Sequence, residues 1–114
     1  MTEEVIEVII SYNEYLSKVP SGSVQIANYL REDNVQNAIQ MVLDFSEGMM
    51  WLVHATELLE KNGVNVEFEV GKIHEFLNEV NSGLEMQDYV LVADMFEYEI
   101  ATFFTEVQPI VGLV

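Results

Sequence analysis

Apolar residues recur at steps of three and four along most of the chain, and this spacing predicts amphipathic α-helices. The first helix is predicted over residues 2–19, with Thr2 as its N-terminal cap and Pro20 as its end. A loop at residues 21–23 and a short helix over residues 24–31 are expected to follow. The apolar stripe of the first helix consists of Val5, Ile6, Ile9, Tyr12, Leu16 and Val19.

A second stripe predicts a longer helix that Asp33 or Asn34 caps and that stops at Asn62-Gly63. Gly48 falls in the middle of this helix, where glycine costs about 1 kcal/mol relative to alanine. We therefore expect another helix to cross closely there, beside Trp51. The stripe consists of Val35, Ile39, Val42, Phe45, Met49, Leu52, Ala55 and Leu59.

Residues 64–69 alternate between apolar and polar, with Val64, Val66 and Phe68 on one side. A single strand has nothing to pair with, so this segment is predicted to be an extended connection whose apolar residues dock on the helices. A helix through Ile73, Phe76, Leu77 and Val80 is expected next, ending at residues 81–83.

The last helix is predicted to begin near Gln87 or Asp88 and to end before Pro109. Its apolar face is wide, which in a small chain means that the helix fills the bundle centre or contributes to a subunit interface. The face consists of Tyr89, Val92, Phe96, Ile100, Phe103 and Val107, with Leu91, Met95 and Phe104 beside them.

These elements predict an all-α fold, an up-down helical bundle of four main helices plus one short helix, in a single domain over residues 1–114. Lys18, Arg31 and Lys61 fall in the last turns of three predicted helices, where a positive charge complements the helix dipole. The apolar residues 110–114 are expected to dock on their own bundle or on a neighbouring copy.

The net charge of the chain excludes some classes of partner. Twenty Asp and Glu stand against four Lys and Arg, which gives a net charge of -16. Ten of the acidic residues and one basic residue lie in residues 67–114. Such a chain repels nucleic acid and anionic membranes, so neither is an expected partner. The one role related to nucleic acid that this charge allows is that of a DNA mimic, which would bind a basic DNA-binding protein.

Cysteine is absent, which excludes disulfides, thiol nucleophiles and iron–sulfur clusters. Thr2-Glu3-Glu4 stands where a signal peptide would be basic, and no uncharged run approaches the length of a membrane span, so we expect a cytoplasmic protein. The Glu-x-x-His pairs of di-iron bundles are also missing, because Trp51 and Gly71 stand three residues before His54 and His74. No cofactor is predicted.

Two acidic motifs allow an alternative prediction, a magnesium site. Glu3-Glu4-Val5-Ile6-Glu7 resembles the E-E-x-x-E motif of magnesium-dependent all-α nucleotide pyrophosphohydrolases, which add an E-x-x-D motif on a facing helix. Here the E-x-x-D is Glu85-Met86-Gln87-Asp88, at a predicted helix boundary. Acidic residues in a first helical turn are also favoured by the helix dipole, and we prefer that interpretation.

Acidic pairs at a spacing of three residues could also chelate a divalent cation, although such pairs arise by chance among 20 acidic residues and a solvated acidic face is the better interpretation. These pairs are Asp44 with Glu47, Glu57 with Glu60, and Asp94 with Glu97. Methionines on helix faces could instead line a groove for a partner helix. They are Met41, Met49, Met50, Met86 and Met95.

The run Asp88-Tyr89-Val90-Leu91-Val92-Ala93-Asp94-Met95-Phe96-Glu97-Tyr98-Glu99 resembles the D-Y-V-L-x-A-D-x-x-E-Y-E segment of small acidic helical proteins of Gram-positive bacteria. That family has no established function. In length, acidity and helicity the chain is also similar to the chaperones that hold flagellar or secreted subunits before export.

The function predicted from the sequence is a non-enzymatic, cytoplasmic protein-interaction module with a chaperone-like role. It is expected to be a homodimer and to bind a basic or amphipathic protein partner through acidic and apolar helix surface. The residues predicted to bind the partner are Asp94, Glu97, Tyr98, Phe103 and Phe104. The alternative is a carboxylate-based divalent-metal protein or a pyrophosphohydrolase-like enzyme.

Overall fold

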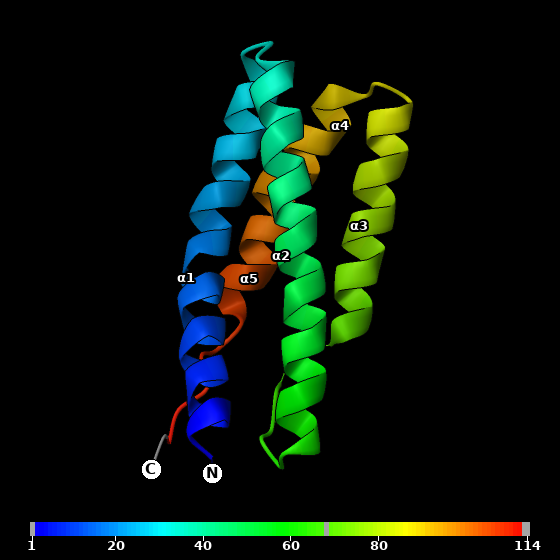
Figure 1. The fold of residues 1–114 in the computed structure, drawn as a ribbon. Helices are drawn as coiled ribbons and strands as arrows, with labels where there is room; N and C mark the ends of the chain where they lie inside the picture. The colour runs from blue at the N-terminus through cyan, green and yellow to red at the C-terminus, as the bar shows by residue number, and fades with distance from the viewer. Residues whose placement is uncertain (1, 68, 113–114) are drawn as a thin grey trace.

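The computed structural model describes residues 2–67 and 69–112, and it contains helices and no strand over that range. The helices form an elongated bundle, 47 × 21 × 21 Å, in which successive passes run in opposite directions (Figure 1). This confirms the predicted all-α, up-down bundle. The passes are α1 (Glu3–Arg31), α2 (Val35–Lys61), α3 (Val70–Glu85) and a last pass of α4 (Tyr89–Asp94), the π-helical turn η1 (Met95–Ile100) and α5 (Ala101–Glu106).

The first helix continues through Pro20, so the predicted break and loop at residues 20–23 are wrong. The buried face of α1 keeps its spacing across the proline, through Leu16, Val19, Ser23, Ile26 and Leu30. An interior proline costs about 3 kcal/mol, whereas each buried branched side chain contributes about 1.5–3 kcal/mol. Burial of Ile26 and Leu30 therefore outweighs the proline, and Lys18 lies within the helix rather than at its end.

Replacing Pro20 by alanine is expected to raise the free energy of unfolding by about 1–2 kcal/mol. The change restores a backbone N–H inside α1, and part of the gain is offset because proline also restricts the unfolded chain. Urea denaturation followed by circular dichroism measures the difference. A loss of stability would show that the proline ring makes packing contacts worth more than the missing hydrogen bond.

Three helices end in the same motif, a residue in the left-handed region followed by an N–H that returns to the carbonyl five residues earlier. The left-handed residues are Asp33, Gly63 and Gln87, with φ of 59°, 78° and 55°. The returning hydrogen bonds run from Asn34 to Tyr29, from Val64 to Leu59 and from Asp88 to Gly83, at 2.8, 2.9 and 2.9 Å. The predicted stop at Gly63 is confirmed, as is the place of Lys61 in the last turn of α2.

The predicted end of α3 at residues 81–83 is wrong, because α3 runs to Glu85. Gly83 stays inside the helix, and its lack of a side chain serves a different purpose. A Cβ at this position would lie 2.6 Å from a methyl carbon of Val92 in α4. Gly83 therefore allows α3 and α4 to approach closely.

Gly48 has a similar role in α2. A Cβ there would overlap the hydroxyl end of Tyr15 from α1. The Tyr15 ring also meets the Trp51 ring edge-on, with 6.2 Å between the ring centres. This confirms the close helix crossing predicted at Gly48 beside Trp51.

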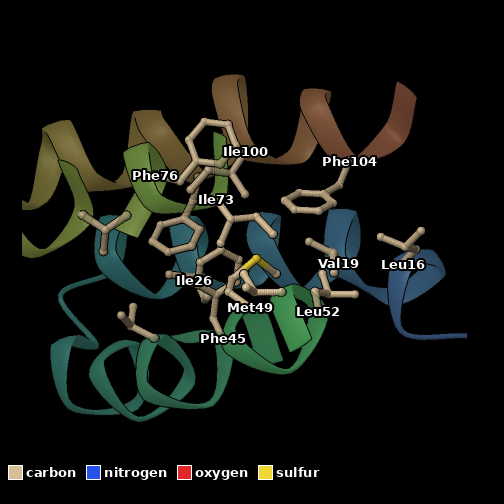
Figure 2. Close-up of a cluster of buried hydrophobic side chains, with 14 of the residues drawn as sticks. Leu16, Val19, Ile26, Phe45, Met49, Leu52, Ile73, Phe76, Ile100 and Phe104 are labelled. Atoms are coloured by element: carbon tan, nitrogen blue, oxygen red, sulfur yellow. The ribbon is translucent and has the colours of Figure 1, made fainter. Parts of the chain in front are cut away.

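The core draws side chains from all four passes (Figure 2). Leu16, Val19 and Ile26 of α1 face Phe45, Met49 and Leu52 of α2, and Ile73, Phe76, Ile100 and Phe104 complete the cluster. The last pass supplies Val92, Phe96 and Ile100 with no exposed surface. The wide apolar face of this pass was predicted either to fill the bundle centre or to contribute to a subunit interface. In the structure it fills the bundle centre.

The π-helical turn explains how the last pass keeps one face in the core. Val92, Phe96, Ile100 and Phe104 follow one another at steps of four residues. In an α-helix each such step drifts by about 40° around the axis, so the four side chains would spread over a wide arc. The wider turn of η1 reduces this drift, and all four residues are buried.

The C-terminal segment docks on its own bundle through Asn13 of α1. The Asn13 side-chain amide donates to the Ile110 carbonyl, and the Asn13 side-chain oxygen accepts from the Ile110 N–H, both at 2.9 Å. Ile110 also packs against the core. Residues 113–114 lie outside the described residues, as does Phe68 in the connection between α2 and α3, where Val64 is buried.

Candidate partner-binding groove

Asp94 and Glu97, two of the predicted partner-binding residues, are bound by Arg31 at the end of α1. The guanidinium Nη2 lies 2.9 Å from Asp94 Oδ1, and Nη1 lies 2.6 Å from Glu97 Oε1. The guanidinium carbon is 5.8 Å from the centre of the Tyr98 ring. These residues, which we call the Arg31 cluster, link the C-terminal end of α1 to the π-helical turn.

The charged side chains of the Arg31 cluster bond to one another. A hydrogen bond from the Tyr98 hydroxyl, together with the one from Arg31, lowers the pKa of Glu97. The same bond to Glu97 raises the pKa of Tyr98. Arg31 thus bonds one oxygen of each of the two carboxylates. Ion pairs between exposed side chains add little to stability, so the cluster is a modest surface link between helices.

The two predicted phenylalanines separate in the structure. Phe104 has 2% of its surface exposed and belongs to the core, so its predicted place on the partner-binding surface is wrong. The cause is the π-helical turn, which rotates Phe104 inward with Ile100. Phe103 is half-buried, stands edge-on to Phe76 at 5.4 Å between ring centres, and lines an open groove.

This groove has a volume of about 530 Å³ and is bounded by the connection before α3, the first turns of α3 and the end of the last pass. We call it the acidic groove. Its lining residues are Glu67, Glu69, Lys72, Glu75, Phe103, Glu106, Val107 and Gln108. Phe103 and Val107 supply its apolar surface, and four carboxylates surround them.

Lys72 is the one basic residue that lines the acidic groove. Its ammonium nitrogen is 3.6 Å from Glu75 Oε2 and 5.4 Å from the centre of the Phe76 ring. Lys72 thus pairs with Glu75, and it is the one basic residue in a lining that also contains Glu67, Glu69 and Glu106. The groove therefore carries an excess of negative charge next to apolar surface.

The sequence analysis did not single out Glu67, Glu69, Glu75 or Glu106. These residues come from segments about thirty positions apart, so no local motif joins them. The sequence feature that indicated this part of the chain was the surplus of acidic over basic residues in residues 67–114. Of the predicted set, Phe103 is the residue that lies in the groove.

The motifs considered for magnesium lie apart. Glu3, Glu4 and Glu7 are in the first turns of α1, whereas Glu85 and Asp88 flank the turn from α3 to α4 at the opposite end of the bundle (Figure 1). Within residues 2–67 and 69–112, no group of three or more His, Asp or Glu is arranged to hold a metal ion.

The methionines do not form one groove either. Met49 and Met95 are buried in the core, and Met86 is 70% exposed near the turn between α3 and α4. None of the helices in the described part of the chain is both long and apolar enough to cross a membrane.

The sequence matches a known protein family. Residues 7–110 match a family described as a domain of unknown function (DUF8042). The chain belongs to this family. The matched range includes every residue of the acidic groove and of the Arg31 cluster, whereas Glu3 and Glu4 lie before it. No curated protein and no solved structure matches the chain.

Proposed function

We propose that this member of the DUF8042 family is a non-enzymatic interaction module that binds a basic, amphipathic segment of a protein partner in the acidic groove. The observation that carries the proposal is the combination of four carboxylates with the apolar surface of Phe103 and Val107 in one open groove. A chaperone-like role, in which the partner is held rather than transformed, would follow from such binding.

The chemistry of the groove defines the partner. Apolar side chains of a bound segment would cover Phe103 and Val107, and its Lys or Arg residues would lie against Glu67, Glu69 and Glu106. The net charge of -16 attracts basic segments from a distance and raises their association rate at low ionic strength. An acidic segment would be repelled at every stage.

A labelled amphipathic peptide of alternating lysine and leucine pairs is a suitable probe, with binding followed by fluorescence anisotropy. The triple variant Glu67→Gln, Glu69→Gln, Glu106→Gln is expected to bind it about tenfold more weakly, since each exposed charge pair contributes up to about 1 kcal/mol. High salt should weaken binding to the wild-type protein. Replacing the leucines of the probe by serines should also weaken it, because the apolar contacts are lost.

The matched control is the triple variant Glu7→Gln, Glu14→Gln, Glu32→Gln, which removes the same charge from exposed positions on and just after α1. It is expected to change the affinity by less than about twofold. Equal weakening by both variants would show that the peptide responds to overall charge and not to the groove. A melting temperature that rises with low concentrations of magnesium or manganese would instead favour the metal-binding alternative.

A further inference from the structure

The outward side of α2 carries apolar residues that stay partly exposed, although Trp51 also meets Tyr15 of α1. Leu43, Met50, Trp51 and Leu58 are exposed by 55%, 40%, 39% and 39%. Helical geometry places them on the side of α2 opposite the buried residues Phe45 and Leu52. We call the part of this side between residues 40 and 61 the outer stripe, and its exposed members are Gln40, Leu43, Glu47, Met50, Trp51, His54, Leu58 and Lys61.

The outer stripe is complementary to itself about its centre. Around the midpoint between Met50 and Trp51, each member has a counterpart at equal distance on the other side. Leu43 corresponds to Leu58, and Met50 corresponds to Trp51, so apolar positions map onto apolar positions. Glu47 corresponds to His54, and Gln40 corresponds to Lys61, so an acceptor maps onto a donor each time.

This order suits a second copy of the same chain. A two-fold dimer requires one surface patch to be complementary to itself. When two α2 helices pack antiparallel about the Met50–Trp51 midpoint, Leu43 of each copy meets Leu58 of the other, and Glu47 meets His54. A partner of different sequence would not require the stripe to be symmetric.

The flanking charges fit the same arrangement. Asp44 and Glu57 lie on opposite edges of the outer stripe, so the antiparallel pairing keeps each away from the other copy's counterpart. Lys61 of the second copy approaches Gln40, whose side-chain amide donates to Asp44 Oδ1 at 3.4 Å. Gln40 is uncharged, so Lys61 of the second copy meets no like charge there.

We propose that the protein forms a two-fold dimer in which the outer stripes of two α2 helices pack antiparallel. The proposal does not depend on the acidic groove, which lies on other elements. The two interactions also respond to salt in opposite ways. Two copies that each carry -16 repel one another, so salt is expected to strengthen the dimer while it weakens binding of a basic peptide.

Sedimentation velocity over a range of concentrations tests the dimer. The wild-type protein is expected to dimerise, and Leu43→Glu and Leu58→Lys are each expected to make it monomeric by placing an unpaired charge in the interface. Val90→Glu and Met86→Lys are the matched controls, because both residues are exposed apolar positions outside α2 and should leave the dimer intact. A monomeric wild-type protein, or a Leu43→Glu protein that still dimerises, would overturn the proposal.

Mixing the two variants tests the antiparallel register. In a mixed dimer the introduced carboxylate faces the introduced ammonium group, and the other equivalent site keeps its Leu43–Leu58 contact. The mixture of Leu43→Glu and Leu58→Lys is therefore expected to form heterodimers at concentrations where each variant alone is monomeric. If the mixture remains monomeric, the proposed pairing of residues 43 and 58 is wrong.

Discussion

Replacing Phe96 by alanine is expected to lower the free energy of unfolding by about 3–5 kcal/mol. Phe96 has no exposed surface, and its ring stands edge-on to Phe45 with 5.1 Å between the ring centres. It also lies in the π-helical turn that directs the last pass into the core. Small domains are stable by about 5–15 kcal/mol in total, so this loss brings the chain close to unfolding. Urea denaturation monitored by circular dichroism measures it.

Tyr98 provides the control for Phe96. It lies two residues further along the same turn and is 63% exposed, so Tyr98→Ala is expected to change stability by about 0.5 kcal/mol or less. Equal losses in the two variants would contradict the assignment of Phe96 to the inner side of the turn and Tyr98 to the outer side.

Replacing Gly83 by alanine is expected to cost about 2–3 kcal/mol, the upper part of the range for an overpacked core. The added carbon would lie 2.6 Å from a methyl carbon of Val92, which is fully buried. Valine has one strongly preferred side-chain rotamer in a helix, so the methyl group cannot simply turn aside. The helices α3 and α4 must separate instead, which weakens the packing around Val92.

Gly22→Ala is the matched control for Gly83→Ala. Gly22 is also inside a helix, but an added Cβ there would meet nothing within 4 Å, so alanine is expected to stabilise the protein by up to about 1 kcal/mol. Adding Val92→Ala to the Gly83→Ala protein should recover part of the clash energy in a double-mutant cycle. A gain of stability from Gly83→Ala alone would show that the two helices are not in close contact there.

Spacing and local chemistry predicted the all-α bundle correctly because each helix has a continuous apolar face. The errors arose where a residue type has two uses. Pro20 was interpreted as a stop, although the buried steps Val19, Ser23 and Ile26 continue the spacing of three and four on both sides of it. Gly83 was interpreted as a helix terminator, whereas Gln87 takes the left-handed conformation and Gly83 accommodates Val92.

The sites were harder to predict than the helices because they are assembled from distant segments. Asp94, Glu97 and Tyr98 form one local cluster, and their spacing was visible in the sequence, but their partner Arg31 lies 63 positions before Asp94. The burial of Phe104 depends on the π-helical turn, whose signal is the run of four-residue steps from Val92 to Phe104. The acidic groove requires the fold itself, because Glu69 and Phe103 meet only when α3 and the last pass are packed together.

The helix α1 contacts segments of the chain that are synthesised much later than α1 itself. This helix packs against α2 and against every part of the last pass, and the Asn13–Ile110 hydrogen bonds join residues 97 positions apart. During synthesis at about 5–20 residues per second, roughly 4–16 s separate the emergence of α1 from that of its final partner. Over that interval α2 and α3 emerge as well, while the apolar residues of α1 that the last pass buries still lack that cover.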